Sequence, residues 1–89
     1  MGTEKIKIAM MTATSKAIDY KRINPKADHE EVLQFIMKDL KAKGQEKIGA
    51  VAAASKALKY LEDPSLSNKQ IMQKVMNESE EILMTMAIE

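Results

Sequence analysis

Two nearly identical segments, TSKAIDY at 14–20 and ASKALKY at 54–60, lie forty positions apart in a chain of 89 residues. The match extends back to positions 7 and 47, and seven of the fourteen aligned positions are identical. A repeat of this kind constrains the fold because each copy is one supersecondary unit that needs its neighbour to bury a core. Whatever unit the first half forms is therefore expected again in the second.

The repeat continues beyond these segments with an offset of 39, which aligns Pro25 with Pro64. We expect the missing residue to lie in the loop between two helices, because loops tolerate insertions and deletions. We predict a single domain over residues 1–89, which contains a tandem repeat of residues 5–43 and 45–83.

Each half contains two runs in which apolar residues recur every three or four positions, the spacing of an amphipathic helix. Asn24 and Asp63 each precede a proline, and the residue before a proline avoids helical backbone angles. Capping boxes at 28–31 and 67–70 then mark the start of the second helix of each half. These signals predict helices over about 4–21, 29–43, 46–62 and 68–86.

The composition favours an all-α fold, because alanine, methionine, lysine and glutamate are abundant and only two prolines and three glycines interrupt them. Thr3 is the expected N-cap of the first helix, and Gly44 is the expected C′ residue of the second. Short connections predict two tandem helical hairpins. The hairpins either close into a four-helix bundle or stack as a short right-handed helical superhelix. The alanine-rich helix over 46–62 is expected nearest the centre.

No group of side chains in the sequence points to catalysis or to a metal. Cysteine is absent, which excludes disulfides and zinc sites built from thiolates. The only histidine, His29, lies between Asp28 and Glu30 at a helix start, where consecutive side chains diverge. The repeated Ser-Lys dipeptides are neighbours on a helix and also face apart. We therefore expect no enzyme activity, no catalytic or cofactor-binding residues and no metal.

The charge pattern is mild. The net charge is +1, and the first 43 residues hold nine basic and six acidic side chains. Most nucleic-acid-binding domains have a stronger basic footprint. No apolar run approaches the ~20 residues of a membrane-spanning helix, and the N-terminus lacks the apolar stretch of a secretory signal. We expect a cytoplasmic protein that does not enter a membrane.

Two surfaces are candidate binding sites. The segment ILMTMAIE at 82–89 is apolar on nearly every side of a helix, so it either folds over the second hairpin or contacts another chain. Its candidate interface residues are Ile82, Leu83, Met84, Met86 and Ile88. Basic side chains also gather around the first loop, and we call this group the basic patch. Its residues are Lys16, Lys21, Arg22 and Lys26.

The proline turns give the chain a resemblance to a known family. ALKYLEDPSLS at 57–67 and IMQKVMNESEEIL at 71–83 resemble uncharacterised protein family 0147, a group of short all-helical archaeal proteins. NPKAD at 24–28 is the counterpart in the first half, and the resemblance spans about 15–85. SNK at 67–69 departs from the family, which has a second proline and then an arginine there. The resemblance implies a helical fold and an archaeal source, and it implies no activity.

Together these features favour a small non-enzymatic module for protein interaction or self-association, with a homo-oligomer formed through the C-terminal helix. The alternative is a weak nucleic-acid-binding or ribosome-associated protein that uses its basic N-terminal half.

Overall fold

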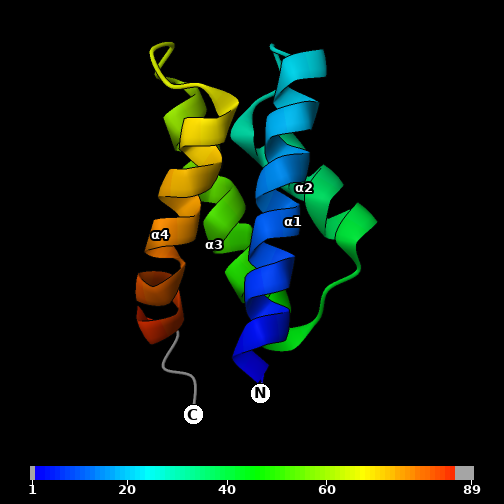
Figure 1. Cartoon of the computed structure of the whole chain (residues 1–89). Helices are drawn as coiled ribbons and strands as arrows, with labels where there is room; N and C mark the ends of the chain where they lie inside the picture. The colour runs from blue at the N-terminus through cyan, green and yellow to red at the C-terminus, as the bar shows by residue number, and fades with distance from the viewer. Residues whose placement is uncertain (1, 86–89) are drawn as a thin grey trace.

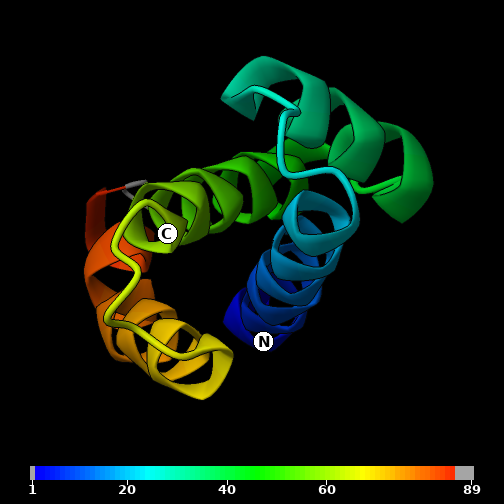
Figure 2. The same cartoon turned by 90° about the horizontal axis from the view of Figure 1, so that it is seen from above.

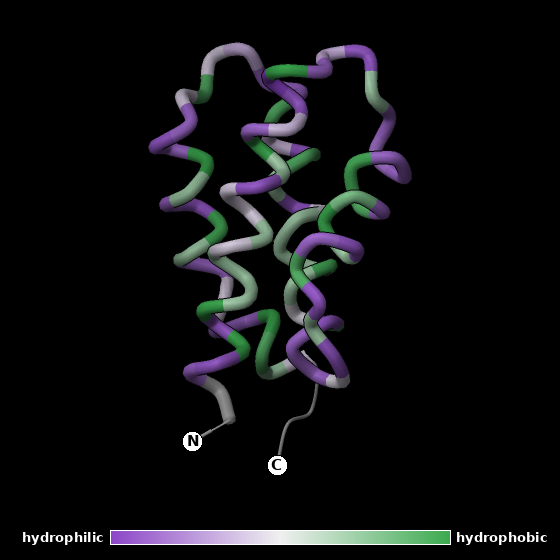
Figure 3. The backbone as a smooth tube through the Cα atoms, turned by 90° about the vertical axis from the view of Figure 1, so that its right-hand side faces the viewer, coloured by the Kyte–Doolittle hydropathy of each residue, from purple (hydrophilic) through white to green (hydrophobic). Residues whose placement is uncertain are grey.

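A computed structural model of the chain describes residues 2–85, and every element in this range is a helix. The four helices are α1 (Gly2–Ile23), α2 (His29–Leu40), α3 (Gly44–Leu61) and α4 (Asn68–Thr85). The predicted all-α fold with four helices is therefore confirmed. Apolar and polar segments alternate along each helix (Figure 3), as expected for helices that bury one face.

The central feature of the fold is the pair formed by α1 and α3, which run side by side in the same direction (Figure 1) and share the most extensive contact in the molecule. α2 and α4 each pack against both members of this pair, from different sides (Figure 2). No Cα atom of α2 lies within 8 Å of one of α4. The structure is therefore a flattened four-helix bundle of 38 × 26 × 16 Å. In its cross-section, α1 and α3 occupy the two opposite corners that lie close together, and α2 and α4 occupy the two that lie far apart.

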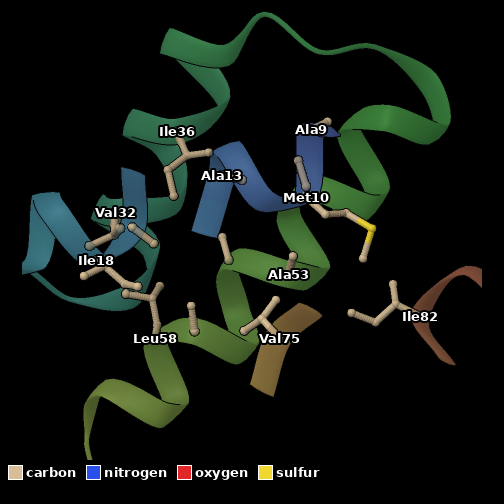
Figure 4. Close-up of a cluster of buried hydrophobic side chains, with 14 of the residues drawn as sticks. Ala9, Met10, Ala13, Ile18, Val32, Ile36, Ala53, Leu58, Val75 and Ile82 are labelled. Atoms are coloured by element: carbon tan, nitrogen blue, oxygen red, sulfur yellow. The ribbon is translucent and has the colours of Figure 1, made fainter. Parts of the chain in front are cut away.

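Small side chains allow α1 and α3 to approach closely. Ala13 and Ala17 of α1 and Ala53 and Ala57 of α3 are fully buried. Larger apolar side chains from all four helices surround these alanines and fill the core (Figure 4). The largest of those that are fully buried are Met10, Val32, Ile36, Leu58, Ile71 and Val75. The alanine-rich composition thus sets the spacing of the central pair, and the predicted central place of α3 is shared with α1.

The two halves repeat in structure as well as in sequence. Each residue from 8 to 25 is as buried, half-buried or exposed as its counterpart from 48 to 65, and the same holds for 28–38 and 67–77 at the offset of 39. Both hairpins therefore bury the same face of each helix. Tandem duplication of the hairpin stays a prediction, and it would account for this agreement.

The change of offset lies where the first helix of each half passes into the loop, at the edge of the connection in which we expected it. In the first half, the amide of Asn24 donates to the carbonyl of Tyr20, four positions earlier, at 2.8 Å. In the second half, the amide of Asp63 donates to the carbonyl of Tyr60, three positions earlier, at 3.0 Å. The tighter turn after Tyr60 absorbs the missing residue, so the segments from Asn24 to α2 and from Asp63 to α4 have the same length.

Side-chain caps start the second helix of each half. Asp28 Oδ1 accepts from the amide of Glu31 at 2.8 Å, and Ser67 Oγ accepts from the amide of Gln70 at 3.2 Å. Gln70 Oε1 also accepts from the amide of Ser67 at 2.9 Å, which completes the predicted capping box. In the first half the box is incomplete, because the Glu31 carboxylate accepts instead from the Tyr20 hydroxyl at 2.9 Å.

Several helix boundaries differ from the prediction by one to three residues, and two of these differences concern predicted cap residues. α1 begins at Gly2, so Thr3 lies within the helix and does not precede it. α2 ends at Leu40, three residues early, because Lys41 adopts the left-handed conformation with φ 58° and ends the helix. Gly44 also has a positive φ, of 59°, but it is the first residue of α3 and not the C′ residue of α2.

Candidate functional site

The apolar C-terminal segment is divided between the core and the surface. Ile82 and Leu83 are only 6% exposed and belong to the chain's own core. Met84, the next residue, is 81% exposed. Met86 and Ile88, the other two candidate interface residues, lie outside the described residues. Within α4, Met84 is thus the one member of this group that offers its side chain to a partner.

Three members of the basic patch lie near the first loop but have different surroundings. The Lys21 ammonium donates to the carbonyl of Ala27, which fastens the loop to α1. The Arg22 guanidinium faces the side-chain amide of Asn68, whose oxygen accepts from it at 3.2 Å when the amide is turned to place the oxygen on that side. Lys26 is exposed. Lys21 and Arg22 therefore hold neighbouring ends of α1, α2 and α4 together. Nucleic-acid binding by the basic patch stays a prediction.

The fourth member, Lys16, belongs to an ion pair that the repeat duplicates. Lys16 of α1 pairs with Asp39 of α2, and its counterpart Lys56 of α3 pairs with Glu78 of α4 at 3.1 Å. Each pair ties the two helices of one hairpin together. Because the Lys and Asp side chains are 34% and 47% exposed in the first pair, solvent screens the attraction and the pair contributes little to stability.

Each hairpin also has a tyrosine whose ring is covered by its second helix. The ring of Tyr20 stacks on Phe35, with the centroids 4.5 Å apart, and the ring of Tyr60 lies 5.7 Å from the Lys74 ammonium. Phe35 and Lys74 occupy equivalent positions of the repeat. A π–π contact in one half is thus replaced by a cation–π contact in the other.

The tyrosine hydroxyls are bonded to carboxylates, which shifts the pKa values of three groups. A hydrogen bond to Glu31 raises the pKa of Tyr20, and a hydrogen bond to Glu78 raises that of Tyr60. Partial burial alone would raise the pKa of Glu78, but the bonds from Tyr60 and Lys56 outweigh it, and the pKa is lowered. Both tyrosines stay protonated as donors at neutral pH, so this arrangement fastens helices.

His29 pairs with an acidic group on another element. Its Nε2 lies 3.1 Å from Glu62 Oε2, at the point where the start of α2 meets the end of α3. The His29 side chain is 45% exposed, so this contact lies at the surface of the molecule. Over residues 2–85, no three acidic or histidine side chains are placed to share a metal ion.

The surface has a groove between α1 and α4. Two large apolar side chains line it, Ile8 and Met76, which are 66% and 54% exposed. The groove has a volume of about 530 Å³. Its other lining residues are Lys7, Met11, Thr12, Ser79 and Glu80. We call this feature the α1–α4 groove.

The charges of the α1–α4 groove neutralise each other. Lys7 Nζ of α1 lies 2.5 Å from Glu80 Oε2 of α4, so the ion pair bridges the two walls. The remaining lining residues are uncharged. The groove therefore offers apolar contact without a net charge.

The exposed apolar residues come in pairs related by the repeat. The counterpart of Ile8 is Ile48 on α3, which is 57% exposed, and the counterpart of Met76 is Met37 on α2, which is 37% exposed. Ile8 and Ile48 are identical although both lie outside the buried faces of their helices, and the same holds for Met37 and Met76. These identities are the signal in the sequence that points to the groove.

No family model, curated protein or solved structure matches this chain. The resemblance to uncharacterised protein family 0147 and the archaeal source it implies therefore stay predictions. Within the described residues, no helix has the length and apolar character needed to cross a membrane.

Proposed function

We propose that this chain is a non-enzymatic protein-interaction module that docks an apolar segment in the α1–α4 groove. The observation that carries this proposal is the exposure of Ile8 and Met76, which face the same groove. Isolated apolar side chains on a surface need no explanation, but several that share one concave site are characteristic of binding surfaces.

The chemistry of the groove favours a neutral, apolar occupant. Met11 and Met76 supply flexible, polarizable side chains, which adapt to partners of different shape. The Lys7–Glu80 ion pair leaves no unmatched charge to attract a nucleic acid or an acidic peptide. An amphipathic helix that presents its apolar face fits this description.

The polar clusters of the molecule support a structural role over a catalytic one. The Lys16–Asp39 and Lys56–Glu78 pairs each join the helices of one hairpin. His29 joins α2 to the end of α3. Each of these side chains contacts an ionisable partner on a neighbouring element, and such contacts fasten the elements together.

The proposal is tested with a fluorescent synthetic helix that has a leucine face and an uncharged polar face. We expect binding, measured by anisotropy, that Ile8→Glu and Met76→Glu each weaken at least tenfold. Ile48→Glu is the matched control, because Ile48 is the repeat counterpart of Ile8 and has similar exposure. Circular dichroism verifies that each variant is folded. Absence of binding, or equal loss in Ile48→Glu, would contradict the proposal.

A further inference from the structure

We infer that the occupant of the α1–α4 groove is a second copy of this chain, docked around a two-fold axis so that α1 of each copy lies in the groove of the other. The inference rests on the proposed function and specifies the partner. Three properties of the groove lead to it: its charge, its area and its difference from the equivalent face of the other half.

The first property is self-complementarity. In a two-fold interface, the same patch lies on both subunits and must complement itself. A patch with one sign of charge repels its own copy, whereas this groove is apolar at its centre and its two charges cancel. Two such patches can meet without an unpaired buried charge. Methionine is also enriched in interfaces, and Met11 and Met76 lie in this one.

The second property is area. α1 has 22 residues and α4 has 18, which correspond to about 33 and 27 Å of helix. With a width of about 10 Å for each helix, the face of α1 and α4 measures roughly 600 Å². Interfaces of standard size begin at about 600 Å² on each partner. The α1–α4 face therefore reaches the lower end of this range when it is covered along its length.

The third property is the difference between this face and its repeat counterpart on α2 and α3. α4 has 18 residues and α2 has 12, which correspond to about 27 and 18 Å of helix. The shorter α2 offers a smaller face, and Met37 is less exposed than Met76. A contact between the two unlike faces would be head-to-tail and would not close at two copies. The α1–α4 face thus favours a closed dimer.

The first experiment is sedimentation velocity over a series of protein concentrations. We expect a dimer for the wild type and at least a tenfold higher dissociation constant for Ile8→Glu and for Met76→Glu. Ile48→Glu and Met84→Glu should keep the wild-type constant, because their side chains lie outside the groove. A wild type that stays monomeric up to millimolar concentration would overturn the inference, as would a dimer that only Ile48→Glu or Met84→Glu dissociates.

The second experiment uses the absence of cysteine from the chain. Met76→Cys and Met37→Cys place a thiol at equivalent positions of the two halves, and a short bismaleimide then links thiols that are close together. We expect a linked dimer from Met76→Cys and at least fivefold less from Met37→Cys. Equal yields would overturn the inference.

The two proposals fail in different ways. A monomeric wild type that binds the synthetic helix in the groove would refute the second copy and leave the interaction module in place. A monomer that binds no helix would refute both.

Discussion

Gly49 lies where any side chain on α3 would meet buried side chains of α1, and Gly49→Ala tests this close approach. A Cβ atom at this position would lie 2.8 Å from Ile6 Cγ2 and 3.3 Å from Met10 Cγ. Carbon atoms attract each other best at about 3.5–4.0 Å, so the first contact is strongly repulsive. Ile6 and Met10 are both buried, and the β-branched Ile6 has little freedom to rotate away.

Two effects of opposite sign determine how Gly49→Ala changes the free energy of unfolding. Glycine costs about 1 kcal/mol relative to alanine inside a helix, so the substitution would stabilise an open position by that amount. Overpacking of a filled core costs about 1–3 kcal/mol. The repulsion outweighs the helix propensity, and we expect Gly49→Ala to destabilise the protein by about 1 kcal/mol. A domain of this size then loses about 4–8 °C in Tm.

Urea unfolding followed by circular dichroism measures this change, and Ile6→Leu identifies its cause. Leucine has no Cγ2, so Ile6→Leu removes the atom that the new methyl group would meet. We expect a coupling of at least 1 kcal/mol in the double-mutant cycle, with the double variant more stable than Gly49→Ala alone. A Gly49→Ala protein that is stabilised by about 1 kcal/mol and shows no coupling to Ile6 would refute the proposed close packing.

Three further predictions concern single residues. Lys41→Gly should stabilise the protein by about 0.5–1 kcal/mol in urea unfolding, because glycine relieves the positive φ of Lys41, and a loss of stability would contradict this origin. Ile82→Ala should cost about 2–4 kcal/mol and Met84→Ala less than about 0.5, and equal costs would show that α4 is rotated. The lowered pKa of Glu78 stabilises the fold above about pH 4.5, and this stability is lost as the pH falls through the folded-state pKa. Glu78→Gln should therefore lose less free energy of unfolding than the wild type between neutral pH and about pH 3, and identical acid profiles would contradict the assignment.

Local signals in the sequence were sufficient to place the helices. α2 and α4 begin at His29 and Asn68, as predicted, because Asp28 and Ser67 precede them and accept hydrogen bonds from their first turns. The end of α2 could not be predicted in the same way. Gly44 has the residue type that ends a helix, but Lys41 takes the left-handed conformation first, at a cost that the tight connection to α3 must offset.

The partners of each helix could not be predicted from periodicity. A stripe of apolar residues shows that a face is buried, but it does not show which helix covers that face. The alanines of α1 and α3 are compatible with many close contacts, and only the structure pairs the two helices directly.

The α1–α4 groove could not be predicted from the sequence for a related reason. The run at 82–84 consists of apolar letters only, yet Ile82 and Leu83 continue the buried face of α4 and Met84 leaves it. Their shared apolar character predicted one surface, whereas the geometry of the helix places Ile82 and Leu83 in the core and Met84 in contact with solvent. Ile8 and Met76, which do share a surface, are 68 positions apart in the sequence, so no local pattern unites them.

The parallel pairing of α1 with α3 affects how the chain acquires its structure. Ile6 and Gly49, which touch across this pair, are 43 positions apart, close to half the chain length. The fastest-folding helical proteins form mostly contacts between residues that are close in sequence. Here the most extensive contact of α1 is with α3, and it cannot form before α3 is present. On the ribosome, α1 therefore keeps its alanine surface uncovered until the middle of the chain has been synthesised, and folding should be slower than in a bundle whose successive helices pack only on each other.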